Sequence, residues 1–120
     1  MKEILIAEDD RAFGPVLKKE LEASNGYRIT LVQDGVEAVL KSVESNYDFV
    51  LLDIKMPNLD GINALRIIKK IRPQAPIITF SGIAGSGEMA NSIKAGAIRC
   101  LSKPFSINQL KEEIKKFIGE

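Results

Sequence analysis

Three acidic residues, a serine and a lysine stand at or directly after the ends of apolar segments in this 120-residue chain. They are Glu8, Asp9, Asp53, Ser81 and Lys103. Carboxylates held close together repel one another and raise each other's pKa, unless a cation lies among them. Mg²⁺ prefers oxygen ligands in near-octahedral geometry and usually keeps waters and a phosphate oxygen. These residue types therefore suit magnesium-assisted phosphoryl transfer, provided that the fold brings them together.

Each of the five residues has a chemical role in such a reaction. Asp9 and Asp53 can ligate Mg²⁺ directly, and Glu8 can act through a water. A carboxylate beside the ion can attack phosphorus and form an aspartyl phosphate. The Ser81 hydroxyl and the Lys103 ammonium can then bind the outer phosphoryl oxygens. Taken singly, each residue is more simply a helix cap, a loop hydroxyl or a solvated charge, so the prediction depends on their joint placement.

Five short apolar segments alternate with helical patterns, which predicts an α/β protein with a parallel sheet. The predicted strands are residues 3–7, 27–32, 48–52, 76–80 and 98–102. The first, third and fourth are almost entirely apolar, as in strands covered by helices on both faces. The second and fifth include Arg28 and Arg99 and suit the two edges.

With right-handed crossovers, these features predict a doubly wound, flavodoxin-like (βα)5 fold with strand order 2-1-3-4-5. Ligands of such sheets bind at the carboxyl ends of the strands, beside the switch point between strands one and three. The five polar residues are predicted to meet at that edge.

The helical patterns carry start signals and apolar faces. Asp34, Asp60 and Ser106 are predicted N-caps, and Pro15 is tolerable only in the first turn of its helix. The faces predicted to be buried are Phe13, Val16, Leu17 and Leu21 in the first helix, Met89 and Ile93 in the fourth, and Ile107, Leu110, Ile114, Phe117 and Ile118 in the fifth. The segment 81–96 is rich in glycine, so we expect a short helix with a mobile start.

The composition limits the possible chemistry. Hydrophobic residues make up 45% and charged residues 28%, with a net charge of +1, which fits one soluble domain over residues 1–120. This charge offers no strong case for binding nucleic acid or a membrane. The absence of histidine excludes Ser-His-Asp and Cys-His catalysis and any histidine-ligated metal within one chain.

The single cysteine, Cys100, cannot form an internal disulfide and fits a reducing, cytoplasmic compartment. The N-terminal segment is neither a signal peptide nor a membrane span. The chain stops directly after the predicted fifth helix, which fits either a complete protein or a domain of a longer one.

Four motifs at these residues resemble the receiver domain of two-component response regulators, most simply the single-domain chemotaxis type. They are Glu8-Asp9, the stretch Leu-Leu-Asp-Ile-Lys-Met-Pro-Asn-Leu-Asp-Gly around Asp53, the stretch Pro-Ile-Ile-Thr-Phe-Ser-Gly ending at Gly82, and Lys103-Pro104-Phe105. The resemblance spans essentially the whole chain. The motifs are specific together, although Lys-Pro-Phe alone is weak.

The resemblance implies a signalling switch rather than an enzyme that turns over a metabolite. The implied site comprises Asp53 as phosphoacceptor; Glu8, Asp9, Asp53 and the backbone carbonyl of Lys55 around Mg²⁺; and Ser81 and Lys103 at the phosphoryl oxygens. The donor would be a sensor histidine kinase or a histidine phosphotransfer protein. A downstream protein would bind the fourth helix, fifth strand and fifth helix. The Lys103-Pro104 peptide would be cis, which is uncommon.

Cys100 departs from the family pattern, because receivers carry an aromatic residue there that turns inward on activation. We interpret Cys100 as a small, partly buried hydrophobe rather than a redox-active residue, and expect output to pass through shifts of the backbone and loop around residues 81–89. Lys55 and Ile83 would flank the route of attacking water. Because Ile83 is apolar, the sequence predicts slow autodephosphorylation.

Three alternatives stay open on the residues alone. A phosphatase of the haloacid dehalogenase type requires a second acid two residues after the nucleophile, where this chain has Lys55. It would also require a cap domain. An inert interaction module would not need the five intact site residues, although Cys100 leaves room for it. A flavin protein would need a phosphate loop after the first strand, where this chain has acids that repel phosphate.

Overall fold

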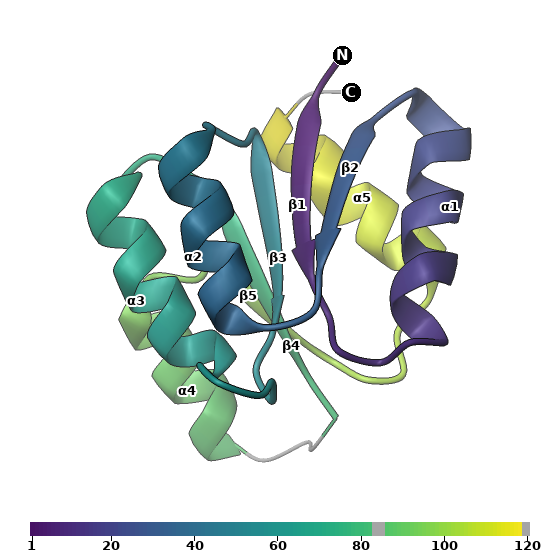
Figure 1. Cartoon of the computed structure of the whole chain (residues 1–120). Helices are drawn as coiled ribbons and strands as arrows, with labels where there is room; N and C mark the ends of the chain where they lie inside the picture. The colour runs from purple at the N-terminus through teal and green to yellow at the C-terminus, as the bar shows by residue number, and fades with distance from the viewer. Residues whose placement is uncertain (83–85, 119–120) are drawn as a thin grey trace.

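The computed structural model describes residues 1–82 and 86–118. In those ranges, five parallel strands form one sheet with helices on both faces (Figure 1). The strands are β1 (Glu3–Ala7), β2 (Arg28–Val32), β3 (Phe49–Asp53), β4 (Ile77–Ser81) and β5 (Arg99–Ser102). The helices are α1 (Phe13–Asn25), α2 (Gly35–Glu44), α3 (Gly61–Ile71), α4 (Ser86–Ala95) and α5 (Ile107–Ile118). The predicted fold class and the strand order β2-β1-β3-β4-β5 are confirmed.

The core lies in two layers because successive side chains of a strand point to opposite faces of the sheet. Ile4 and Ile6 of β1 pack with buried residues of α1 and α5, whereas Leu5 and Ala7 pack with buried residues of α2 and α3. β3 and β4 are buried along their whole length, as their apolar sequences predict. The sheet is therefore a rigid base for the side chains at its edge.

The predicted helix starts are confirmed by hydrogen bonds that the side-chain caps accept from backbone N–H groups. Asp34 accepts from the backbone N–H of Glu37 at 2.8 Å, and Asp60 accepts from that of Asn63 at 2.8 Å. The Ser106 hydroxyl accepts from the backbone N–H of Gln109 at 3.0 Å. Such caps satisfy backbone donors that have no partner within the helix.

Three residues predicted to be buried are substantially exposed: Val16 by 54%, Ile93 by 49% and Phe117 by 40%. The prediction was wrong for Val16 because α1 buries a narrow strip of residues four apart, Leu17 and Leu21, and Val16 lies beside that strip. Phe117 packs against Phe49, and their ring centroids are 6.4 Å apart.

The helix α4 is attached to the sheet by a polar contact where the sequence predicted an apolar one at Ile93. Ser92 is fully buried, and its hydroxyl hydrogen-bonds the hydroxyl of Thr79 on β4, which is also fully buried. A buried hydroxyl needs such a partner because it has lost its water. The segment that leads into this helix was predicted to be mobile; it includes residues 83–85, which lie outside the described residues.

Replacing Ser92 with alanine is expected to lower the free energy of unfolding by about 1–2 kcal/mol, because the buried hydroxyl of Thr79 loses this partner and keeps the longer hydrogen bond, of 3.5 Å, to the carbonyl of Arg99. Denaturant unfolding followed by circular dichroism measures the change. Ser45→Ala, at an exposed position after α2, is the matched control and should be nearly neutral. Equal stabilities for the two variants would show that the buried pair contributes nothing to the attachment of α4.

Candidate functional site

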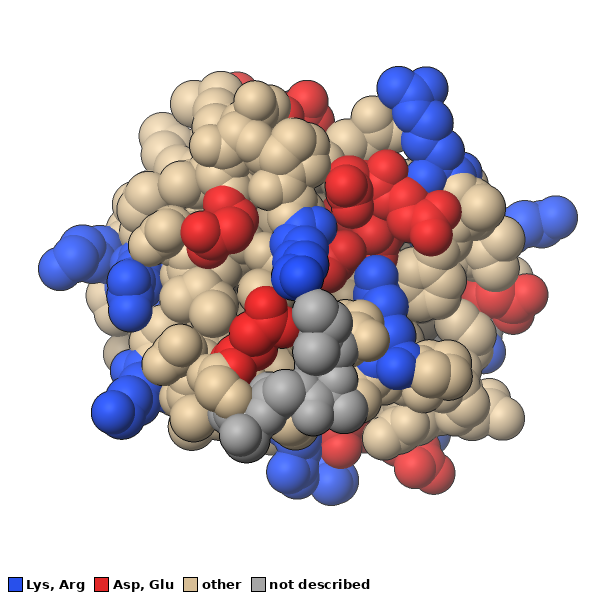
Figure 2. All heavy atoms as spheres, turned by 90° about the horizontal axis from the view of Figure 1, so that it is seen from below, with Lys and Arg blue, Asp and Glu red and all other residues tan. Residues whose placement is uncertain are grey.

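The predicted site residues gather at the carboxyl edge of the sheet. Glu8 follows β1 directly, Asp53 and Ser81 are the last residues of β3 and β4, and Lys103 follows β5. Because the strands are parallel, these positions share one edge although they are far apart in sequence. Figure 2 shows this edge, where acidic and basic side chains lie next to one another.

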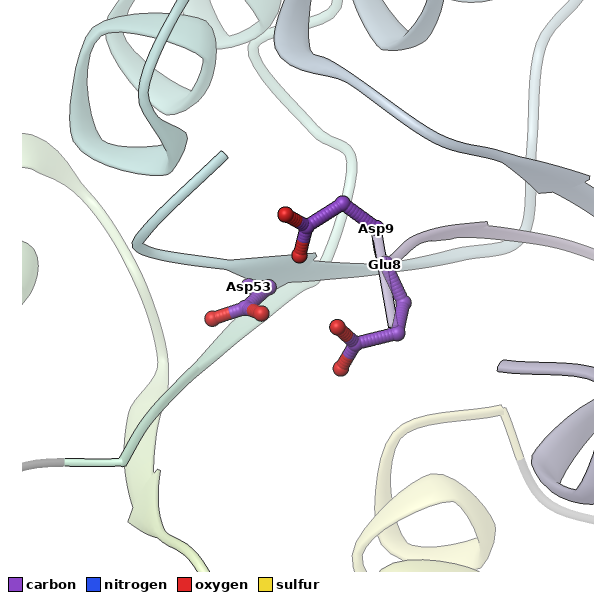
Figure 3. A group of neighbouring side chains, drawn as sticks. All are labelled: Glu8, Asp9 and Asp53. Atoms are coloured by element: carbon purple, nitrogen blue, oxygen red, sulfur yellow. The ribbon is translucent and has the colours of Figure 1, made fainter. Parts of the chain in front are cut away.

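The three acids form a compact group. Glu8, Asp9 and Asp53 each offer a carboxylate oxygen within 4.8 Å of the others, and Figure 3 shows their carboxylates around a common space. Two oxygens bound to one Mg²⁺ at about 2.1 Å lie at most about 4.2 Å apart, so the group is close to the size that this ion needs. Glu8 and Asp53 are buried and Asp9 is exposed, which leaves the group open to solvent on one side.

Lys103 holds the two buried acids. Its Nζ donates to Oε1 of Glu8 at 2.9 Å and to Oδ2 of Asp53 at 3.2 Å. The same ammonium lies 5.3 Å from the ring centroids of Phe13 and Phe80, within the range of cation–π attraction. Lys103 is therefore fixed by opposite charge on one side and by aromatic faces on the other.

The pKa shifts agree with this charge arrangement. Burial raises the pKa of Glu8, and the neighbouring Asp53 raises it further, while the hydrogen bond from Lys103 opposes both. Burial by itself would lower the pKa of Lys103, but its hydrogen bond to Glu8 and the charge of Asp53 together raise that pKa. Lys103 is thus held as a charged ammonium, and a divalent cation among the three carboxylates would reduce the repulsion between them.

Ser81 is buried and faces a partner that sequence reasoning missed. Its hydroxyl donates to the carboxylate of Glu88, which lies in the first turn of α4. Nothing in the spacing marks Glu88, because its contact depends on how α4 sits against β4. Glu88 and Asp9 also line an open cavity of about 760 Å³ between α4 and the segment after β3. This cavity reaches Asp9, the exposed member of the acidic group.

Other sequence-based expectations have mixed outcomes. The Lys103-Pro104 peptide is cis, as predicted. Cys100 is buried, which agrees with its interpretation as a small hydrophobe. The backbone N–H of Lys55 donates to Oδ1 of Asp53 at 3.3 Å, while the role of its carbonyl towards a metal stays a prediction. The expected effect of Ile83 on water also stays a prediction, since Ile83 lies outside the described residues.

The strand order and the acidic group beside a lysine agree with the family to which comparison with known sequences assigns the chain. The chain belongs to the response regulator receiver domain family, whose model matches residues 4–115. It is 36% identical over 116 residues to the chemotaxis protein CheY of Bacillus subtilis, a match that covers 96% of this chain and 97% of CheY. It is 34% identical to the response regulator MprA of a Mycobacterium species, covering 96% of this chain but 50% of MprA.

Solved structures agree with this assignment. A CheY-like receiver domain protein from Methanospirillum hungatei superposes with a TM-score of 0.94 at 31% identity, covering 99% of this chain and 94% of that one. The receiver domain of a Pseudomonas aeruginosa sensor histidine kinase gives 0.89 at 36% identity, covering 99% and 98%. That structure has a magnesium ion coordinated in its active site cleft. Among the residues described for our chain, no helix has the length and apolarity to cross a membrane.

Proposed function

We propose that this protein is a phosphoacceptor switch in which Asp53 takes a phosphoryl group from a phosphohistidine. The donor is a sensor histidine kinase or a histidine phosphotransfer protein. The observation that carries the proposal is the group of three acids within 4.8 Å of one another, two of which are bonded to Lys103. Such a group suits a hard cation and a transferring phosphoryl group together.

In the transfer, an oxygen of Asp53 forms a bond to phosphorus while the phosphorus–nitrogen bond of the donor breaks. The electron pair of that bond stays on the imidazole nitrogen. Glu8, Asp9, Asp53 and the backbone carbonyl of Lys55 would hold Mg²⁺, which neutralises charge on the transferring group when bound. The ammonium of Lys103, which already lies beside Asp53, then binds the new phosphoryl oxygens. The hydroxyl of Ser81 donates a hydrogen bond to the same oxygens.

The phosphorylated domain, which we take to span residues 1–120, then changes its affinity for a downstream protein. We assign that contact to the face formed by α4, β5 and α5. Two features support this assignment: β5 is an edge strand, and Ile93 of α4 is half-exposed to solvent. The protein acts as a signalling switch in the cytoplasm, with neither nucleic acid nor membrane as a direct partner, in keeping with its net charge of +1.

Acetyl phosphate with Mg²⁺ tests the proposal without a kinase. Intact mass should show one added phosphoryl group, formed as Asp53 attacks phosphorus and acetate leaves. Removing Mg²⁺ with EDTA should lower the yield at least about tenfold, because about 1.4 kcal/mol or more of charge neutralisation is lost. The absence of an adduct under saturating donor would favour an inert interaction module on the same fold.

A further inference from the structure

Two polar contacts attach α4 to β4. Glu88 accepts a hydrogen bond from Ser81, and Ser92 shares one with Thr79. Glu88 and Ser92 are four residues apart and lie on one face of the helix, while Ser81 and Thr79 are two apart and lie on one face of the strand. The spacings match, since four helical residues rise about 6 Å and two strand residues about 6.6 Å.

The two contacts differ in what surrounds them. The pair Thr79–Ser92 is fully buried beneath α4. The pair Ser81–Glu88 stands at the edge of the sheet, where Glu88 lines the cavity that also reaches Asp9. The Thr79–Ser92 pair, here called the inner contact, is therefore shielded from the site. The Ser81–Glu88 pair, here called the outer contact, lies next to the site.

The outer contact competes with a phosphoryl group. A serine hydroxyl has one proton to donate, so Ser81 cannot donate to Glu88 and to a phosphoryl oxygen at once. Phosphorylation also replaces the single negative charge of the Asp53 carboxylate with a phosphoryl group that carries about −1.5 to −2, and this larger charge repels a carboxylate nearby. Both effects act against the bond between Ser81 and Glu88.

We infer that Glu88 is a positioning residue that holds the Ser81 hydroxyl towards α4 until Asp53 is phosphorylated. When the phosphoryl group takes this hydroxyl, the first turn of α4 is released and the buried Thr79–Ser92 pair acts as the pivot. The inference rests on the proposed function of Asp53. It also supplies a route from the site to α4 that needs no aromatic ring at the position of Cys100.

The test compares the parent protein with Glu88→Ala and Glu88→Gln in Mg²⁺ and subsaturating acetyl phosphate. Glu88→Ala should raise the rate of adduct formation about three- to tenfold, because Ser81 no longer has to leave a charged acceptor. The rate for Glu88→Gln should lie between those of the parent and Glu88→Ala, since the amide oxygen still accepts a hydrogen bond from Ser81 but carries no charge. Glu112→Ala, at an exposed position on α5, is the matched control and should behave as the parent does.

A double-mutant cycle separates this role from a general charge effect. In a Ser81→Ala background, Glu88→Ala should change the rate less than about twofold, because Glu88 no longer has a hydroxyl to hold. Hydrogen exchange of residues 86–92 gives a second readout. It should rise on phosphorylation of the parent and already be high in unphosphorylated Glu88→Ala.

The outcomes distinguish the two proposals. Equal rates for the parent and both Glu88 variants, with an adduct on the parent, would overturn the role of Glu88 and leave the role of Asp53 standing. If Glu88→Ala raised the rate of adduct formation equally with and without the Ser81 hydroxyl, the role of Glu88 would also be overturned, since the lost charge alone would then explain the faster rate. No adduct on the parent would overturn both proposals. If Glu88→Ala fails to fold, the rate of adduct formation in the isosteric variant Glu88→Gln, compared with that of the parent, tests the role of Glu88.

Discussion

Asp53→Asn is expected to abolish the phosphoryl adduct while the protein stays folded. Asparagine has nearly the shape of aspartate, and its side-chain oxygen can still accept a hydrogen bond from Lys103 or from the backbone N–H of Lys55. It lacks the anionic oxygen that attacks phosphorus. The substitution also removes a negative charge that raises the pKa of Glu8, so Glu8 is no longer repelled by a second buried acid.

Intact mass after incubation with acetyl phosphate and Mg²⁺ measures this loss. The matched control is Asp60→Asn, which changes an acid in the segment just after β3 but keeps the N-cap of α3, because asparagine caps as well as aspartate does. The control should form the adduct at the parent's rate within about twofold. An adduct that survives Asp53→Asn would place the phosphoacceptor elsewhere.

Gly61→Ala is expected to lower the free energy of unfolding by about 3 kcal/mol or more, the largest stability effect that we predict. A Cβ atom at this position would lie 2.1 Å from the carbonyl oxygen of Asp53 and 2.8 Å from Cα of Ile54. These are backbone atoms, so no side chain can rotate out of the way. The backbone N–H of Gly61 also donates to the carbonyl of Ile54 at 2.7 Å, and a shift would weaken that bond.

Denaturant unfolding measures the loss, and the adduct yield should fall as well, because the end of β3 carries Asp53. The matched control is Gly87→Ala in α4, where an added Cβ meets nothing within 4 Å. That variant should be about 0.5–1 kcal/mol more stable than the parent, since alanine favours a helix over glycine. Similar stabilities for the two variants would contradict the close approach of α3 to the end of β3.

The sequence was sufficient for the fold because local and global signals agree in this chain. The apolar segments, the caps at Asp34, Asp60 and Ser106, and the polar residues Arg28 and Arg99 on the edge strands all indicate one architecture. Bounds differ by a residue at several strands; β3, for example, ends on Asp53 where we expected its end at residue 52. Strand ends are set by hydrogen bonds to neighbours, which a single segment does not show.

Which side of each helix is buried was harder to predict. Val16 and Ile93 are apolar and fit the helical periodicity, yet both are exposed by about half. Periodicity marks an apolar stripe, but the orientation of the helix on the sheet decides which edge of the stripe is covered. In α4 the side that faces the sheet includes the buried hydroxyl of Ser92, which the apolar pattern of Met89 and Ile93 does not mark.

The sequence alone determined the order of the strands and, through it, the set of polar residues at the carboxyl edge, because parallel strands place their ends together wherever they lie in the chain. Only the tertiary structure decided which hydrogen-bond partner each residue of that set has. Lys103 bonds Glu8 and Asp53, and Ser81 bonds Glu88, because the β5 edge and the register of α4 bring these groups within hydrogen-bonding distance. Such contacts depend on distances of a few ångströms between separate elements, which no pattern within one element contains.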